Sequence, residues 1–574
     1  MKKFTTYLVL VIATVCNSGV SYAQRGGEEV IITTIGNRSV ENSQRVASTP
    51  KILDTVFPVP NANFPLLAID YMPSFDLQRI APATVSLQQK LNQLYPGYAK
   101  IGIGSVLMPM ADVYYNNTRS RKYNYGGNVQ HISSFGPMRD VAPANFDRTA
   151  VRGFVSVTEK KYGWDAEALY KNQGLHFYGF PNENANADSI GQRFTTVGTS
   201  AQFHSHKKDS GAVNWHAGIA YRHFNDKKPM ADSLADWRAT ENYFAITGSA
   251  SKRIGNEIFE AAIGLQNNRY NYGVLDSMIG VADSGFVRNN TFFYLRPHVT
   301  TYGKNGRLKA QIGVDISISK WDNTKAYLYP DFSAKYSMFK DALIPYVALK
   351  GGLTQQSFYA LTGVNEFVLS HVELRNENKA LEAVIGLKGT ISKRIGFNVM
   401  ASFANVKDRA LFVKDTLHSA GNRFNVIYDT MNITTFEAAL NYQLHEKIKL
   451  DLVGRYYSYN ALNNTYAWNL PQVQFVLRGS YNLYDKFIFS ADVNLEGGRK
   501  ALVYATESGA TLENGQYAVP LGFIADANLS VEYRYNKRIS AFLNFNNIAA
   551  QRYKRWYNYP TQGLQAMAGV TFRF

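Results

Sequence analysis

The sequence holds one histidine pair whose spacing suits metal binding, His204-Ser205-His206. Side chains two positions apart on a strand share a face, and imidazoles are good ligands for Zn²⁺, Cu²⁺ and Ni²⁺. The stretch that follows, 207–211, supplies no carboxylate on that face, and the other histidines are scattered along the chain. We therefore interpret 204–206 as a polar strand end, and we predict no metal site and no cofactor.

Two serine-containing stretches, Ser134-Phe135-Gly136 and Asp283-Ser284-Gly285, have the composition of a catalytic serine turn. A nucleophile elbow needs its serine on a sharp turn between a strand and a helix, and neither stretch has that context. Cys16 is the only cysteine and precedes the expected signal cleavage site after Ala23, so thiolate catalysis is excluded from the mature chain. We predict that the protein is not an enzyme.

Ionisable residues recur on one parity of alternating segments such as 449–456 and 487–496, while apolar residues occupy the other parity. A period of two places successive side chains on opposite faces of a strand. Two roles for the charges stay open: ion pairs that stabilise the lumen of a barrel, or selectivity for an anionic or polar solute. The residues on the polar parity are Asp315, Asp451, Arg455, Asp492, Glu496, Glu532, Arg534 and Arg573.

Segments of this kind continue from residue 99 to 574, and they predict a transmembrane barrel. Mean hydropathy is only −0.24 although aromatic residues make up 14% of the chain, with 38 Tyr and 34 Phe. Alternating strands keep average hydropathy low while interfacial girdles raise the aromatic content. The clusters 327–329, 456–457, 466–468 and 556–559 are interpreted as such interfacial anchors.

The predicted fold is all-β, a single antiparallel transmembrane β-barrel. We count roughly 21 strands after residue 100, and single-chain bacterial barrels have an even number. We therefore predict about 22 strands, within roughly 18–24, with Phe64–Tyr71 as the candidate for the missing strand.

The connections between these segments have two lengths. Tight basic turns occur at 251–255, 392–396, 445–448, 484–487 and 536–539. Longer polar loops occur at 181–191, 273–290, 357–378, 408–422 and 499–520. Outer-membrane barrels have short periplasmic turns and long extracellular loops, so this alternation favours the same class.

The region before the barrel has a different composition. Residues 1–23 have the form of a cleaved signal peptide: Lys2 and Lys3, an apolar stretch, and Ser21-Tyr22-Ala23 as a small-x-small cleavage site. Many of the 18 prolines lie between positions 50 and 96. Because proline cannot donate to a strand ladder, we predict that 24–98 is an irregular N-terminal arm, in the periplasm or in the lumen.

The chain ends in GVTFRF, which resembles the C-terminal β-signal of outer-membrane barrels. The matching residues are Gly569, Phe572 and Phe574, and the resemblance implies insertion by the barrel-assembly machinery. Residues 541–574 also resemble the end of TonB-dependent receptors, although 561–564 depart from the Pro-Gly-Arg that usually follows the equivalent of Pro560. The residues that carry this second resemblance are Asn544, Asn546, Asn547, Tyr553, Tyr559, Pro560 and Gly563.

A stretch near the mature N-terminus resembles the segment of those receptors that pairs with TonB. It consists of Glu28, Glu29, Val30, Ile31, Ile32, Thr33 and Thr34, and an extended arm without this role is the alternative. The arm is too short for the globular plug of the family. The chain therefore looks like a plug-less relative of the receptors, of a kind common in Bacteroidota, in the outer membrane of a Gram-negative cell.

Two functions follow from this class. The first is transport or uptake of a solute, with TonB as a partner. The second is a non-conducting structural subunit of a larger outer-membrane complex, with an envelope lipoprotein as a partner. The lumen must be filled by the arm, by inward-folded loops such as 357–378, or by another protein, and we favour the arm. The formal net charge is +17, but charges dispersed over the strands of an exported chain argue against a nucleic-acid partner and leave lipids as the surroundings.

Overall fold

We analysed a computed structural model of the chain. It describes residues 94–574 except 181–183, 208–210, 228–237, 273–274, 277–280, 283–285, 322 and 445–446. The predicted signal peptide, the TonB-box-like stretch 28–34 and the predicted arm up to residue 93 lie outside the described residues. Among the described residues, no helix is long and apolar enough to cross a membrane.

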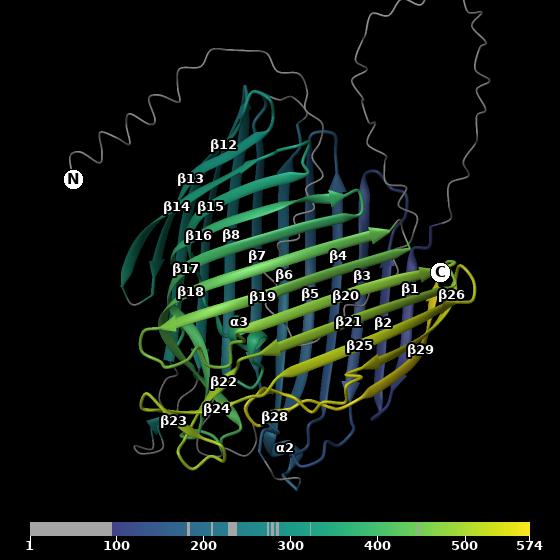
Figure 1. The fold of residues 1–574 in the computed structure, drawn as a ribbon, viewed down its shortest axis with the longest axis vertical. Helices are drawn as coiled ribbons and strands as arrows, with labels where there is room; N and C mark the ends of the chain where they lie inside the picture. The colour runs from purple at the N-terminus through teal and green to yellow at the C-terminus, as the bar shows by residue number, and fades with distance from the viewer. Residues whose placement is uncertain are drawn as a thin grey trace, which may run out of the picture. The chain divides into compact units, whose positions relative to one another are not determined.

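The described chain forms a closed 22-stranded antiparallel barrel in which strands that follow one another in sequence are neighbours (Figure 1). The predicted fold is therefore confirmed. The first strand, β1, begins at Gly97, two residues before the predicted start of the barrel. The barrel strands are β1 (Gly97–Gly104), β2 (Met108–Asn116), β3 (Tyr123–Ser134), β4 (Phe146–Thr158), β5 (Tyr162–His176), β6 (Gly191–Ser205), β7 (Asn214–Asp226), β8 (Ala239–Ile254), β9 (Glu257–Tyr272), β12 (Phe286–Tyr302), β13 (Leu308–Lys320), β14 (Thr324–Tyr336), β15 (Leu343–Thr354), β16 (Glu377–Ser392), β17 (Ile395–Asp415), β18 (Arg423–Leu444), β19 (Ile448–Ala461), β20 (Val473–Leu483), β21 (Phe487–Gly497), β25 (Ile524–Arg534), β26 (Ile539–Asn546) and β29 (Gln565–Arg573).

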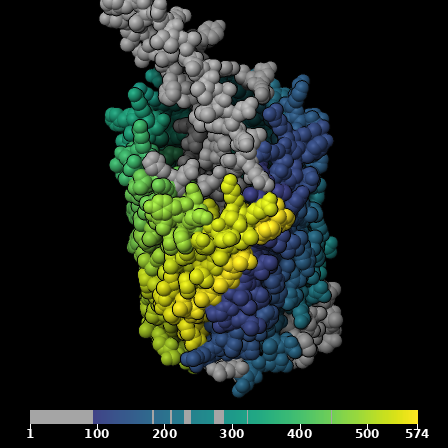
Figure 2. Space-filling view, turned by 90° about the vertical axis from the view of Figure 1, so that its right-hand side faces the viewer, coloured from purple at the N-terminus to yellow at the C-terminus, as the bar shows by residue number. Residues whose placement is uncertain are grey.

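The barrel closes where its last strand, β29, meets β1, and Figure 2 shows this seam as yellow against purple. Phe574 lies just beyond β29, and its backbone exchanges hydrogen bonds of 2.9 and 3.0 Å with Gly97. A Cβ at Gly97 would overlap the Phe574 ring, so only glycine allows the terminal ring to lie there. The described strands close the ring from β1 to β29, and Phe64–Tyr71, the candidate for a further strand, lies outside the described residues.

The two parities of each strand face lipid and lumen as predicted. On β29, Val570 and Phe572 face outward, whereas Met567 and Thr571 are buried on the lumenal side. On β13, Ile312 is 60% exposed while Asp315 and its same-parity neighbours are buried. An apolar outer face with a polar inner face is the arrangement of a barrel in a membrane.

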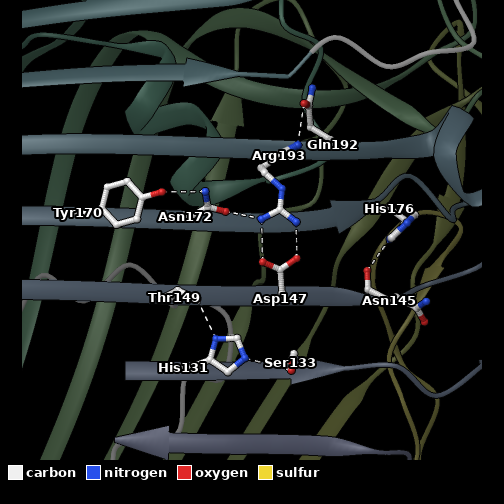
Figure 3. Close-up of polar contacts among 10 residues, drawn as sticks. All are labelled: His131, Ser133, Asn145, Asp147, Thr149, Tyr170, Asn172, His176, Gln192 and Arg193. Atoms are coloured by element: carbon white, nitrogen blue, oxygen red, sulfur yellow. Dashed lines mark hydrogen bonds and ion pairs between the residues drawn. The ribbon is translucent and has the colours of Figure 1, made fainter. Parts of the chain in front are cut away.

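A polar network marks where the apolar belt ends on strands β3–β6 (Figure 3). Arg193 on β6 donates to both carboxylate oxygens of Asp147 on β4, at 2.7 and 2.9 Å. Arg193 and Asp147 have the same outward parity as the exposed Val197 and Val151 further along their strands. The membrane-facing surface therefore begins beyond this network.

Most connections are short at one end of the barrel and long at the other, as predicted, although 105–107 and 321–323 at the second end have only three residues each. At one end, the short-turn end, lie 117–122, 159–161, 206–213, 255–256, 337–342, 393–394, 445–447, 484–486 and 535–538. At the other, the long-loop end, lie 105–107, 135–145, 177–190, 227–238, 273–285, 321–323, 355–376, 416–422, 462–472, 498–523 and 547–564. The long loops carry α2 (Ala187–Ile190), α3 (Phe358–Val364), β10 (Leu275–Asp276), β11 (Val281–Ala282), β22 (Lys500–Val503), β23 (Thr511–Glu513), β24 (Gln516–Pro520), β27 (Lys554–Trp556) and β28 (Tyr559–Pro560).

Four predicted loop ranges were too wide, and one of them, 181–191, includes Gly191, the first residue of β6. The range 273–290 includes the start of β12, 408–422 includes the end of β17, and 357–378 includes the start of β16. These strands extend further toward the long-loop end than the sequence pattern indicated, and on β17 the extension buries Leu411, Phe412 and Val413.

Most of the predicted aromatic anchors are not at the membrane interface. Tyr456 is exposed on the outer face, as expected, but Trp468, Trp556, Tyr559 and Tyr329 are buried inside the molecule. Trp468 packs with residues of β17 and β18, and Trp556 and Tyr559 pack in a core beneath the long loops. The interpretation as anchors is therefore wrong for Trp468, Trp556, Tyr559 and Tyr329, whereas Tyr456 has the exposure expected of an anchor.

Candidate functional site

The connection between β15 and β16, residues 355–376, folds into the barrel and is the candidate functional element. We call it the lumen loop. It contains α3, which is drawn within the barrel outline in Figure 1. Its apolar residues pack on wall residues that include Phe194, Phe224, Tyr270 and Phe424. The buried apolar residues of the loop are Phe358, Leu361, Phe367, Val368, Leu369, Val372 and Leu374.

The helix α3 begins where the barrel wall supplies its cap. The Ser357 hydroxyl accepts a hydrogen bond of 3.1 Å from Ala360 N, which satisfies a free N–H of the first turn. Glu241 of β8 lies against the same end, and its Oε2 accepts from Phe358 N at 2.6 Å and from Tyr359 N at 3.4 Å. A carboxylate at a helix N-terminus is stabilising, so the wall fixes where α3 starts.

Polar contacts hold the rest of the lumen loop to one side of the wall. Arg148 of β4 binds both oxygens of Glu366, at 2.8 and 3.1 Å. The Ser370 hydroxyl donates to the carboxylate of Asp226 on β7, and Tyr270 OH of β9 donates to Ser370 O. Asp226 also accepts from Ala239 N at 2.6 Å. The buried carboxylate is thus hydrogen-bonded from both the loop and the wall.

Further contacts tie the lumen loop to other parts of the ring. Leu369 N donates to Phe424 O of β18 at 2.8 Å, and Tyr428 OH of the same strand donates to Glu373 O at 2.7 Å. Asn376 bonds Ser319 of β13 at 2.8 Å. The loop leaves the wall at β15 and reaches β4, which lies about half-way round the ring, so it crosses the lumen.

Other long loops join this layer. Tyr559 stacks on Phe367 with ring centroids 3.7 Å apart, and its hydroxyl donates to Asn422 O. Tyr178 donates to Pro560 O at 3.1 Å, and burial raises the pKa of both tyrosines. Residues of four loops therefore form one packed layer near the long-loop end.

A cavity of about 450 Å³ lies against the wall beside α3. Strands β7, β8 and β9 each carry one residue that lines the cavity and another that contacts the lumen loop. On each of these strands, the residue that lines the cavity is nearer the short-turn end. Arg222 precedes Phe224 on β7, Tyr243 follows Glu241 on β8, and Gln266 precedes Tyr270 on β9. The cavity therefore lies on the short-turn side of the loop layer.

Two arginines face this cavity. The Arg222 guanidinium lies 4.0 Å from the Tyr359 ring centroid and 4.8 Å from that of Tyr243. Arg296 lies 4.2 Å from the Tyr294 ring centroid, and its Nε donates to Asp315 at 2.7 Å. No carboxylate is among the described residues that line the cavity.

The predicted β-signal residues lie together at the seam. Phe572 and Phe574 are exposed on the outer face with ring centroids 5.9 Å apart. Gly569 faces the lumen, where a Cβ would overlap Ile101 O. Their recognition by assembly machinery stays a prediction.

The histidine pair lies near the short-turn end of the barrel, beside a carboxylate. His204 and His206 have ring centroids 5.8 Å apart, and Asp165 of β5 lies 3.5 Å from His204, a neighbour the sequence did not reveal. Within the described part of the chain, no group of three or more His, Cys, Asp or Glu residues is placed to hold a metal.

Several lumenal charges form the predicted ion pairs. Arg455 binds Glu437 at 2.7 Å, and Arg478 lies 3.2 Å from Asp492. The residues that fasten the lumen loop were not predicted: Arg148, Asp226, Glu241 and Tyr270. The interpretation of 357–378 as a polar loop overlooked its apolar residues, and these are the signal that could have predicted a loop packed in a core.

The sequence has no match among protein-family models and none among curated proteins. Solved structures do match. The FrpB iron transporter from Neisseria meningitidis superposes with a TM-score of 0.64 at 9% identity, over 84% of this chain and 82% of that one. The ferripyoverdine receptor of the outer membrane of Pseudomonas aeruginosa gives 0.59 at 12%, over 85% and 72%. The chain has the barrel fold of these proteins.

The ferric-catecholate import receptor Fiu from Escherichia coli is a third example, with a TM-score of 0.59 at 12% identity over 84% of this chain and 82% of that one. At such identities the likeness concerns the fold alone. Arg222, Arg296 and the lumen loop therefore have to be interpreted from their own geometry.

Proposed function

We propose that this chain takes up a solute across the outer membrane of a Gram-negative cell and that the lumen loop gates the path. The observation that carries the proposal is a wide barrel whose lumen holds one folded loop and a cavity behind it. The fold shared with an iron transporter and import receptors supports it. By the usual rule for such barrels, the short-turn end faces the periplasm and the long loops face outside.

The chain is further proposed to be a plug-less relative of the TonB-dependent receptors, of the Bacteroidota type. Support comes from the lumen loop, which occupies space that a plug would otherwise fill. Signal peptide cleavage after Ala23 and coupling to TonB through 28–34 belong to the same proposal. Deleting 28–34 should abolish energy-dependent uptake in cells while leaving barrel assembly intact. Unchanged uptake would contradict the proposed coupling to TonB.

The test of uptake is conductance with and without the lumen loop. Replacing 358–374 by a Gly-Ser linker should convert a closed or weakly conducting barrel into a large open pore in planar bilayers. The variant should also swell liposomes in a sugar that the wild type excludes. A correctly folded variant whose conductance equals that of the wild type would contradict a gating role.

A non-conducting structural subunit is the second candidate. The observation that favours it is the fastening of the lumen loop to both sides of the ring by buried contacts. Purification from detergent-solubilised membranes separates the two. A stoichiometric complex with an envelope lipoprotein and no solute flux supports the structural role, whereas a monomer that conducts supports uptake.

A further inference from the structure

The cavity beside α3 presents positive groups on its surface and keeps negative groups behind them. Arg222 and Arg296 both line it. Their partners, Glu241 and Asp315, are buried and are not among the lining residues. A solute in the cavity therefore meets N–H donors first.

Each guanidinium retains donors for a ligand. A guanidinium carries five N–H groups in a planar fork that matches carboxylate and phosphate oxygens. Arg222 gives one contact to Glu241 at 3.3 Å, and Arg296 gives its Nε to Asp315. Nε of Arg222 is buried, so the oxyanion would use the terminal N–H groups of the two guanidinium groups that these contacts leave available.

The rest of the lining suits a ligand with a flat apolar part. The rings of Tyr243, Tyr294 and Phe292 line the same space, and the side-chain amide of Gln266 adds a donor and an acceptor. The guanidinium groups of Arg222 and Arg296 already lie against tyrosine rings, so these cation–π contacts orient both groups before a ligand binds. A volume of about 450 Å³ accommodates a small molecule rather than a polymer.

We propose that this cavity binds a small anionic solute, one that carries a carboxylate or phosphate for Arg222 and Arg296 and an apolar face for the tyrosine rings. The inference deepens the proposed uptake function, on which its physiological meaning rests. It places the binding step behind the loop layer, on its short-turn side. A ligand there would contact Tyr359 of α3, so its binding would act directly on the lumen loop.

The experiment measures binding by the full-length protein in detergent, by calorimetric titration. Phenyl phosphate and benzoate are the anionic probes and distinguish the two oxyanions, while benzyl alcohol and benzylammonium are the neutral and cationic controls. Probes of this size should bind with a Kd on the order of millimolar. Failure of both anions to bind, or equal binding of benzyl alcohol, would overturn the proposal.

The variants Arg222→Gln and Arg296→Gln should each raise the Kd of the better anion about tenfold. Arg455→Gln is the matched control, because Arg455 also faces the lumen and its Nε donates to a carboxylate at 2.7 Å, but it lies outside the cavity. An equal loss of binding in Arg455→Gln would refute the site. If Arg222→Gln does not fold, Arg222→Lys can be used instead, because it keeps a cation beside Glu241. It should still weaken anion binding several-fold. Unchanged binding in Arg222→Lys would contradict a role for the guanidinium group of Arg222.

The outcome also separates this inference from the proposed function. One outcome is that anion binding depends on both arginines but the barrel conducts nothing after the loop is replaced. That result would support the binding site and contradict the proposed uptake function. If solute passes through the barrel but neither anion binds, the uptake function is supported and the binding site is contradicted.

Discussion

Replacing Phe358 by alanine should open the barrel without unfolding it. Phe358 is fully buried at the start of α3, where its ring lies 5.5 Å from Tyr270 and 5.6 Å from Phe224, centroid to centroid. These partners belong to the wall, so the ring joins the lumen loop to β7 and β9. The strand ladder does not use this side chain, and the barrel should therefore remain closed as a cylinder.

The size of the effect follows from the packing. Truncating a buried phenylalanine to alanine costs about 3 to 5 kcal/mol through lost burial and the cavity left behind. Because the contacts of Phe358 exist only when the loop is folded in, nearly all of that cost falls on the closed state. Each 1.4 kcal/mol is a factor of about ten, so the open population should rise at least a hundredfold.

Single-channel recording in planar bilayers is the assay, with open probability as the measured quantity. Phe358→Ala should show frequent long openings that are rare in the wild type. Phe542→Ala is the matched control, since Phe542 is a buried phenylalanine of β26 that packs with Met108, Met110 and Met567 and not with the loop. Both variants should keep heat-modifiable mobility on gels, which reports a folded barrel.

Two results would refute the reasoning. A folded Phe358→Ala barrel with wild-type open probability would mean that the lumen loop does not control the path. Equal opening in the Phe542→Ala control would mean that loosening any part of the wall suffices, and that the loop has no special role.

Three other perturbations give separate tests. Burial lowers the pKa of His371 to about 4, so the contribution of His371 to the closed state should be complete above pH 6.5 and should fall by about 3 kcal/mol as pH falls toward 4; over that window the open probability of the wild type should rise relative to that of His371→Gln. Gly97→Ala should push the Phe574 ring aside and reduce the folded fraction on gels, whereas Gly153→Ala, which has open space, should not. Glu366→Gln weakens a partly exposed ion pair and should change open probability less than tenfold.

The barrel could be predicted because its determinants are local. Alternation along 563–574 sets which face of the last strand meets lipid, and the structure places Val570 outward and Thr571 inward accordingly. The short basic turns were equally visible, since they interrupt the alternation at regular points. The predicted number of about 22 strands is confirmed, although only roughly 21 were counted after residue 100.

The candidate site could not be predicted because its residues meet only after closure. Arg148 and Glu366 are more than two hundred positions apart, and nothing in the sequence pairs them. The buried aromatic residues posed a different difficulty. Trp468 and Tyr559 were interpreted as membrane anchors because lipid and a protein core are both apolar, and composition does not distinguish them.

The balance between apolar and polar contacts is consistent with the proposed role of the lumen loop as a gate. Asp226 and Glu241 each lose hydrogen bonds when the loop leaves, but water can replace those partners, so each bond contributes only about 1 kcal/mol net. The buried apolar side chains of the loop have no such replacement in an open lumen. Closure therefore depends mainly on apolar packing, while the polar contacts fix where the loop sits.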